Sequence, residues 1–203
     1  MKQDREYRSM ELRVLPGERK APEEYEPSYM VEGYASTYEP YKLMTIDGVD
    51  YYERIEPTAF DNADISDVVF RVDHEGRVYA RTSAGTLNVW HDEHGFGQKT
   101  DLSKTQAARE LFADIQAGNY PKMSFAFVVE DDGDEYERET KTRVIYRIKK
   151  LFDVSPVSHP ANPGTEIGVS LRDRINGEIE AETAERLEAE RQRLILQLRL
   201  KHF

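Results

Sequence analysis

The sequence predicts a mainly β fold with added helices (α+β): an antiparallel β-barrel or sandwich edged by helices, with a helical tail. Short segments in which apolar and polar residues alternate fill most of the chain between residues 6 and 155. Clusters of Gly, Asp and Asn separate these segments, as turns between antiparallel strands require. One internal segment and the C-terminal end carry helical patterns instead. The strands are therefore expected to form one domain, and the helical tail is expected to follow it as a separate segment.

Seven segments have the alternation of strands, which gives each of them one apolar face. In chain order they are residues 7–15, 29–36, 67–74, 78–81, 86–90, 123–129 and 143–152. Between the last two, Glu130 to Lys141 carries seven acidic residues around Gly133. Because so dense a charge is costly to bury, this stretch is expected to be an exposed hairpin tip that joins two partner strands.

The internal helix is expected over residues 104–117. Its apolar positions recur at i, i+3, i+4 and i+7, as Ala108, Leu111, Phe112 and Ile115. Ser103 and Gln106 fit a capping box at its start. Gly118 supplies the residue after the last turn, and Pro121 prevents the helix from resuming. The helix therefore leads the chain directly into the strand that begins near Met123.

Composition excludes several classes of protein. The chain has 203 residues, a net charge of −11 and no cysteine. The acidic balance argues against general binding to nucleic acid or anionic membranes, and the lack of Cys excludes thiol nucleophiles and disulfide scaffolds. No apolar run is long enough for a membrane span, and the N-terminal residues lack the apolar segment of a signal peptide. A soluble protein of a cytoplasm-like compartment is expected.

Three polar residues occupy strand positions that aim them at a shared surface. His74 ends the apolar face formed by Val68, Phe70 and Val72, and Ser124 shares its strand face with the small Ala126. Asp153 follows the strand 143–152, the expected partner of the Ser124 strand. A hydroxyl, an imidazole that accepts its proton and an acid that orients the imidazole are the set that serine hydrolysis needs. Spacing alone is weak support, because most chains of this length contain such residues.

Five segments, in order, resemble the prohead (capsid maturation) protease family of tailed bacteriophages, distant relatives of the herpesvirus assemblins. They are VEGYAS at 31–36, ERIEPTAF at 53–60, DH at 73–74 with RT and GTL at 81–87, GNYPKMSFAF at 118–127, and DVSPVS at 153–158 running into PANP. The resemblance covers residues 28 to 167. It implies an assemblin-like β-barrel, with Ser124 as nucleophile, His74 as general base and Asp153 as third member. Where Thr58, Ala126 and Asp153 stand, the family commonly has Gly, Gly and Glu.

The resemblance implies a serine endopeptidase that needs no cofactor or metal. Its substrates would be the phage scaffold or the scaffolding region of the major capsid protein, and the chain itself. It would act in the host cytoplasm inside the immature capsid, without nucleic acid or membrane as partner. Self-association stays open, and the backbone amides of residues 158–164 are the candidates for stabilising the oxyanion.

Four alternatives to this interpretation, or to parts of it, remain open. His159 rivals Asp153, because the herpesvirus relatives resemble a Ser-His-His arrangement. Two alternatives to a protease are a non-catalytic capsid-assembly module of the same fold and an esterase. The GxSxG pattern of many esterases is missing around Ser124. The run His91 to His94 could offer metal ligands, but its place beside Gly95 favours a hairpin turn.

The sequence divides into a protease domain at residues 1–170 and a helical tail at 171–203. Helix formers dominate the tail, with acids in its first half and basic residues in its second. Leu194, Ile195, Leu196, Leu198 and Leu200 make its end apolar on more than one side. We expect the tail to dock the protease on its scaffold or on a second copy, the alternative being a helix packed on the barrel.

Overall fold

The computed structural model describes residues 6–14, 28–158 and 169–200. The chain forms two compact units, Met1–Glu166 and Ile167–Phe203. The first unit contains the strands and a short helix, and the second contains a long helix.

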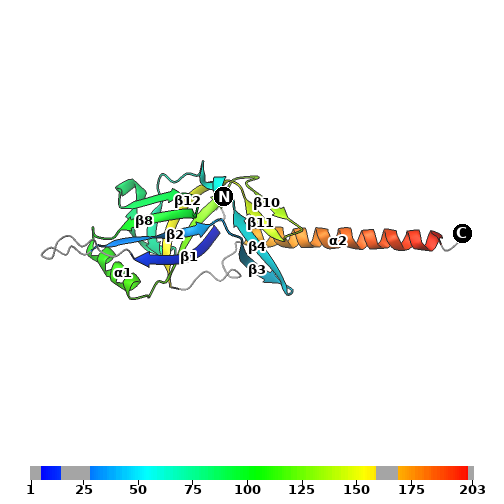
Figure 1. The fold of residues 1–203 in the computed structure, drawn as a ribbon, viewed down its shortest axis with the longest axis horizontal. Helices are drawn as coiled ribbons and strands as arrows, with labels where there is room; N and C mark the ends of the chain where they lie inside the picture. Colours follow the sequence, from blue (N-terminus) through cyan, green and yellow to red (C-terminus); the bar gives the residue numbers. More distant parts are fainter. Residues whose placement is uncertain (1–5, 15–27, 159–168, 201–203) are drawn as a thin grey trace. The chain divides into compact units, whose positions relative to one another are not determined.

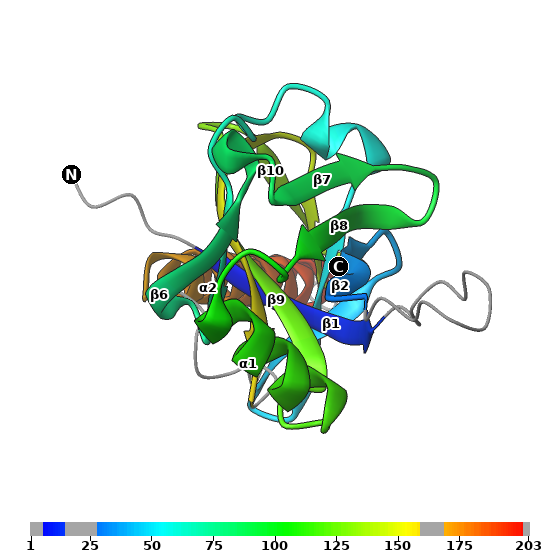
Figure 2. The same ribbon diagram turned by 90° about the vertical axis from the view of Figure 1, so that its left-hand side faces the viewer.

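The larger sheet of the first unit has eight strands in the order β6-β5-β12-β9-β1-β2-β8-β7. Figure 1 labels β1, β2, β8 and β12 of this sheet. Their bounds are β1 Glu6–Val14, β2 Met30–Thr37, β5 Val69–Val72, β6 Glu75–Arg81, β7 Leu87–His91, β8 Gly95–Asp101, β9 Lys122–Val129 and β12 Ile148–Val157. Neighbours run antiparallel except β12 and β5, which are parallel. Figure 2 shows β1 lying beside β9, its ladder partner near the middle of the sheet.

The smaller sheet has four strands in the order β10-β11-β4-β3. Their bounds are β3 Tyr41–Ile46, β4 Val49–Ile55, β10 Asp134–Glu137 and β11 Thr142–Ile145. Strands β11 and β4 are parallel, whereas the other two pairs are antiparallel. Two short 3₁₀ turns, Pro57–Phe60 and Thr82–Ala84, connect strands outside both sheets.

The predicted fold class, mainly β with helices, is confirmed. Within the part of the chain that the structure describes, no ladder joins β6 to β7, so the large sheet is open at these edges. The expected single strand 143–152 is wrong: it divides into β11 and β12, which belong to different sheets. The chain turns between them because the amides of Tyr146 and Arg147 both donate to the carbonyl of Gly133, at 2.8 and 3.0 Å.

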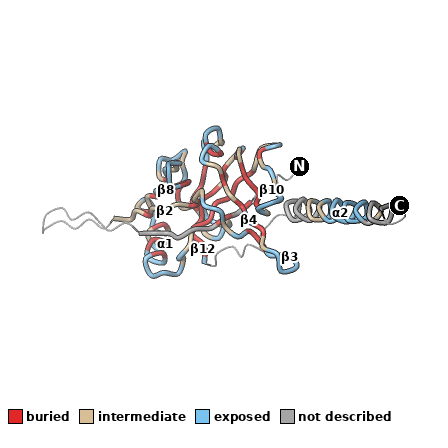
Figure 3. Tube along the Cα trace, turned by 45° about the vertical axis from the view of Figure 1, so that its right-hand side comes forward, coloured by how far each residue is buried: buried red, intermediate tan, exposed pale blue. Residues whose placement is uncertain are grey.

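The core lies between the strands, where the buried segments of Figure 3 gather. Four phenylalanines are among its largest fully buried side chains, namely Phe70, Phe96, Phe125 and Phe127. The rings of Phe125 and Phe127 stack at 4.8 Å, and Phe60 stacks on Phe96 at the same distance. This places the bulky face of β9 in the core, as its alternation predicts, and leaves the Ser124 face on the other side of the strand.

Helix α1 spans Gln106–Gln116 and buries the four apolar residues expected of it. Its cap is Thr105 and not Ser103, because the Thr105 hydroxyl accepts the amide of Ala108 at 3.1 Å. Gly118 follows in the left-handed conformation, with φ at 85°, and donates to the carbonyl of Ile115. Since this conformation is strained for other residues, Gly118 fixes where the helix ends and the chain turns toward β9.

A buried ionic cluster joins β1 to the smaller sheet. Arg8 and Arg143 both donate to Glu53 Oε2, at 2.7 and 2.8 Å, and both also contact Glu6. Tyr41 donates to Glu53 as well. Burial alone would raise the pKa of Glu53, but the two guanidinium groups outweigh it and lower this pKa to about 2. The carboxylate is therefore charged inside the protein, with a donor at each oxygen.

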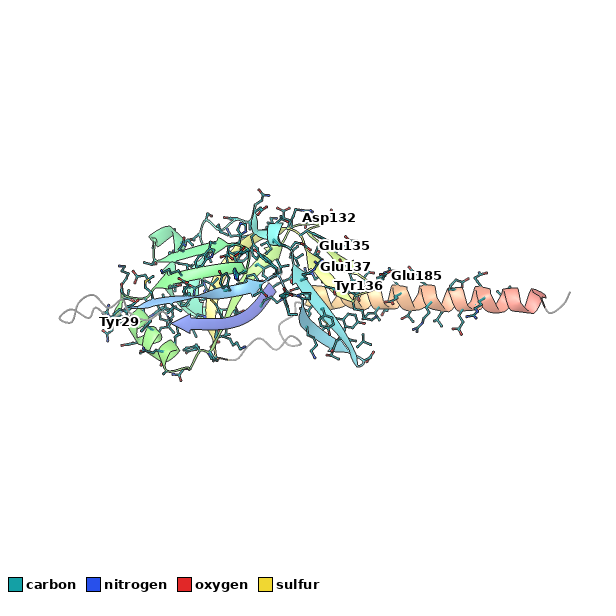
Figure 4. All side chains as sticks on the ribbon, in the orientation of Figure 1. Tyr29, Asp132, Glu135, Tyr136, Glu137 and Glu185 are labelled. Carbon is teal, nitrogen blue, oxygen red and sulfur yellow. The ribbon has the colours of Figure 1, made fainter. Side chains whose placement is uncertain are left out.

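The acidic hairpin is only partly the exposed tip that its composition predicts. Asp132, Glu135 and Glu137 lie along the hairpin that contains β10 (Figure 4). Asp134, however, keeps only 5% of its side chain exposed and forms an ion pair with Arg143. One acid of the run thus belongs to the buried ionic cluster, which the expectation of a fully exposed stretch missed.

The second unit contains helix α2, which spans Val169–Leu200. Among its described side chains, Leu187 is 58% exposed. No helix in the described ranges is both long enough and apolar enough to cross a bilayer.

Candidate active site

Ser124 lies on β9, between β12 and β1. Strand alternation puts Ser124 and Ala126 on one face, while Met123, Phe125 and Phe127 occupy the core face. Ser124 is fully buried. Its position is fixed on both sides by ladders, because it pairs with Ser155 of β12 and with Ser9 of β1.

His74 was expected at the end of a strand, but it lies in the tight turn between β5 and β6, two residues after the last residue of β5. Asp73 and His74 both have left-handed backbone conformations, with φ at 47° and 60°. Residues other than Gly rarely adopt this conformation, and it persists only where the surroundings enforce it. Hydrogen bonds supply that enforcement: Ser158 N donates to Asp73 at 2.9 Å, Asp73 N donates to Pro156 O, and Arg71 donates to His74 O.

Asp153 lies within β12, whereas the sequence suggested a position just after a strand. It pairs with Val69 of β5 and with Ala126 of β9. A bulge between Leu151 and Asp153 inserts Phe152 as an extra residue, since Leu151 pairs with Phe127 and Asp153 with Ala126. In an unbroken strand Leu151 and Asp153 would share a face. The bulge separates them, leaving Leu151 in the core and turning Asp153 toward the Ser124 face.

The structure brings the three residues together into a continuous chain of contacts. His74 Nε2 lies 2.7 Å from Ser124 Oγ, and His74 Nδ1 lies 2.6 Å from Asp153 Oδ1. A carboxylate accepts only, so Nδ1 carries the proton and Nε2 is free to accept the proton of the Ser124 hydroxyl. Asp153 is 1% exposed, and its side chain is held by the imidazole. The arrangement can deprotonate a serine and stabilise the imidazolium that results.

Sequence reasoning missed one further polar group in this place. Ser155 Oγ donates to Asp153 Oδ1 at 2.7 Å, and Ser155 is fully buried. The available signal was its spacing: two residues after Asp153 on a strand, it has to share that residue's face.

The other candidate residues divide into those that the structure describes and those that it does not. His159 and residues 160–164 lie outside the described residues. In the run His91 to His94, His91 is the last residue of β7, and the other three residues form the hairpin turn to β8. Asp92 accepts the amide of His94 at 2.8 Å and the Tyr34 hydroxyl at 2.8 Å. These bonds lower the pKa of Asp92 to about 2. The carboxylate of Asp92 thus stabilises the turn by accepting hydrogen bonds within it.

Comparison with known proteins gives one family. A family model described as caudovirus prohead serine protease matches residues 17–178. Among solved structures, the bacteriophage T4 capsid assembly protease gp21 is similar at 11% sequence identity and a TM-score of 0.49. The match covers 79% of this chain and 100% of that one. No curated protein matches the sequence.

Proposed function

The chain belongs to the caudovirus prohead serine protease family, and on that premise we propose that it is a serine endopeptidase of capsid maturation with Ser124 as its nucleophile. The observation that carries the proposal is the contact chain from Ser124 through His74 to Asp153, at 2.7 and 2.6 Å. No part of this constellation needs a cofactor, because the hydroxyl, the base and the orienting acid all come from the chain.

In the proposed reaction, Ser124 Oγ attacks the scissile carbonyl carbon while His74 Nε2 takes the hydroxyl proton. His74 then gives that proton to the leaving amine, and an acyl-enzyme remains on Ser124. A water molecule then attacks the ester carbon while His74 Nε2 takes one of its protons. The bond from that carbon to Ser124 Oγ breaks, His74 returns the proton to Ser124 Oγ, and the carboxylic acid product leaves. Asp153, in contact with His74 Nδ1, holds the imidazole in the required tautomer and stabilises the imidazolium.

Substrate binding has to open the surface above the nucleophile. Ser124 is fully buried, whereas a reacting carbonyl must approach its hydroxyl to about 3 Å. The His74 side chain is 10% exposed and is the member of the three that reaches toward solvent. We therefore place the approach of the peptide on the His74 side of β9.

The proposed substrates are the scaffold or the scaffolding region of the major capsid protein, together with the protease itself. The proposed place of action is inside the immature capsid. A net charge of −11 suits that place, because an acidic protease is not retained by the genome that later fills the shell.

The test is co-expression of the full chain with the major capsid protein and scaffold of its own phage. We expect mass spectrometry to find defined cleavage products with the wild type and none with Ser124→Ala or His74→Ala. Ser36→Ala is the matched control, because it removes a buried hydroxyl on β2, away from the site. Equal products from wild type and Ser124→Ala would overturn the proposal and favour a non-catalytic assembly module.

A further inference from the structure

Ser155 lies at the centre of the site although the reaction described above gives it no role. It pairs directly with Ser124 across the β12–β9 ladder, while Asp153 pairs with Ala126 two residues away. The four side chains therefore form a block on one face of the sheet: two opposite pairs, with Asp153 and Ser155 on one strand and Ala126 and Ser124 on the other.

Two donors meet on one oxygen of Asp153. The Ser155 hydroxyl donates to Oδ1 at 2.7 Å, and His74 Nδ1 donates to the same atom at 2.6 Å. Both Asp153 and Ser155 are almost completely buried. In such surroundings a hydrogen bond to a carboxylate is strong, because little water competes for the charge. The hydroxyl thus restrains the rotation of the carboxylate and keeps Oδ1 directed at the imidazole.

A second buried serine shows that this bond is not the only way to satisfy a serine hydroxyl. Ser36 is 3% exposed, and its hydroxyl donates to the backbone carbonyl of Thr37 at 2.9 Å. Ser155 instead donates to the side chain that orients the base. Its hydroxyl is therefore tied to the chemistry of the site as well as to its own burial.

We propose that Ser155 is a positioning residue of this protease, which acts through Asp153 to hold the His74 imidazole in line with Ser124. The proposal rests on the proposed function. It predicts that the hydroxyl at position 155, and not the volume of the side chain, controls the reactivity of Ser124.

The experiment measures how fast a rhodamine-tagged fluorophosphonate labels the full-length protein. In this reaction a bond forms from Ser124 Oγ to phosphorus, the phosphorus–fluorine bond breaks, fluoride leaves and His74 takes the proton. The variants are Ser155→Ala, Ser155→Thr and Ser155→Val, with Ser36→Ala as control. Thr and Val have nearly the same shape, so both carry the same steric cost and differ by the hydroxyl alone.

We expect Ser155→Ala and Ser155→Val to lower the maximal labelling rate by about tenfold or more, with the probe concentration at half-maximal rate unchanged. Ser155→Thr should label several times faster than Ser155→Val, and Ser36→Ala should label like the wild type. In an Asp153→Ala background, Ser155→Ala should change nothing further, because the group through which it acts is gone.

The outcomes separate the two proposals. Equal labelling of wild type and Ser124→Ala would overturn the proposed function. If Ser124→Ala alone loses labelling and Ser155→Ala keeps the wild-type rate, only the role of Ser155 is overturned. Equal rates for Ser155→Thr and Ser155→Val, with thermal melts lowered alike, would likewise overturn it and leave Ser155 a packing residue.

Discussion

Ala126 is the smallest feature on which the site depends. It lies opposite Asp153 on the neighbouring strand and is fully buried. The imidazole of His74 spans from Asp153 to Ser124, so it has to cross the space beside the Ala126 methyl group. A larger side chain here would occupy the place of the imidazole.

We therefore predict that Ala126→Val lowers cleavage of the co-expressed capsid protein by about 100-fold or more while the domain stays folded, as a misplaced catalytic group commonly does. Ala35→Val on β2 is the control, because Ala35 is also fully buried and receives the same added volume. Its overpacking costs about 1–3 kcal/mol of stability but should spare the activity of the folded protein. Near wild-type activity in Ala126→Val would show that the imidazole does not need this space.

Asp153→Asn tests the third member of the site. An amide in place of the carboxylate favours the wrong tautomer of His74, so we expect turnover to fall by roughly 10³–10⁴-fold. His159→Ala should lower turnover much less. The measurement is the rate of product formation in the two variants. A greater loss in His159→Ala would assign the third position to that histidine instead.

At the scale of elements, helix α1 offers a matched pair of capping variants. Thr105→Ala removes the hydroxyl that accepts the Ala108 amide and should lower the free energy of unfolding by about 1 kcal/mol. Ser103→Ala should cost clearly less, because Ser103 lies outside the helix and does not cap it. Urea unfolding of both variants decides the matter, and a larger loss in Ser103→Ala would contradict the assigned cap.

The buried ionic cluster gives stability a pH dependence. Glu53 has its pKa lowered from 4.5 to about 2 in the folded chain, so folding favours its ionised form. This contribution is fully present above about pH 5 and is lost as pH falls toward 2, because the unfolded chain binds the proton more tightly. We expect the free energy of unfolding, measured by urea titration, to decrease as the pH is lowered from 5 to 2.

Glu53→Gln separates this effect from the other acids. It removes the Glu53 carboxylate that Arg8 and Arg143 share and leaves the two guanidinium groups with one buried negative charge fewer, so stability at neutral pH should drop by about 3–5 kcal/mol. Between pH 5 and 2 the variant should then lose less stability than the wild type. An equal slope in both proteins would show that Glu53 does not contribute to it.

Alternation made His74, Ser124 and Asp153 candidates, and the resemblance to the prohead proteases selected them among many such residues, so all three could be named from the sequence. The bulge at Phe152 could not, since a single extra residue leaves no mark on composition. The left-handed turn at Asp73 and His74 could not be predicted either, because partners distant in sequence, such as Ser158, enforce it.

The fold shows the same division between local and distant causes. The hairpin of β3 and β4 turns at Asp47 and Gly48, both left-handed, and this Asp-Gly pair was a local signal that went unused. The split of 143–152 between two sheets was different: it depends on the Gly133 carbonyl, which no pattern within the segment reveals.

At the scale of the whole molecule, the two ends of the chain are expected to differ in importance. We propose that a chain ending at Ser170 folds and keeps its protease activity, because the strands and the three site residues all precede that point. A chain lacking residues 1–14 should be insoluble, because it loses β1 and the Glu6 and Arg8 members of the buried cluster.

Solubility, melting temperature and fluorophosphonate labelling of both truncations are the measurements. Loss of folding in the chain that ends at Ser170 would show that the tail belongs to the protease domain. If that chain stays active but no longer enters capsids, the tail has the proposed docking role.

The order in which the strands are synthesised bears on when the enzyme can act. Strand β1 leaves the ribosome first, yet on one side it pairs with β9, so that Glu6 meets Phe127. Asp153 on β12 emerges later still. Contacts this far apart in sequence close slowly and late in folding. A nascent chain therefore cannot bring Ser124, His74 and Asp153 together until β12 has left the ribosome and paired with β9, so the candidate site forms only after most of the strands have been synthesised.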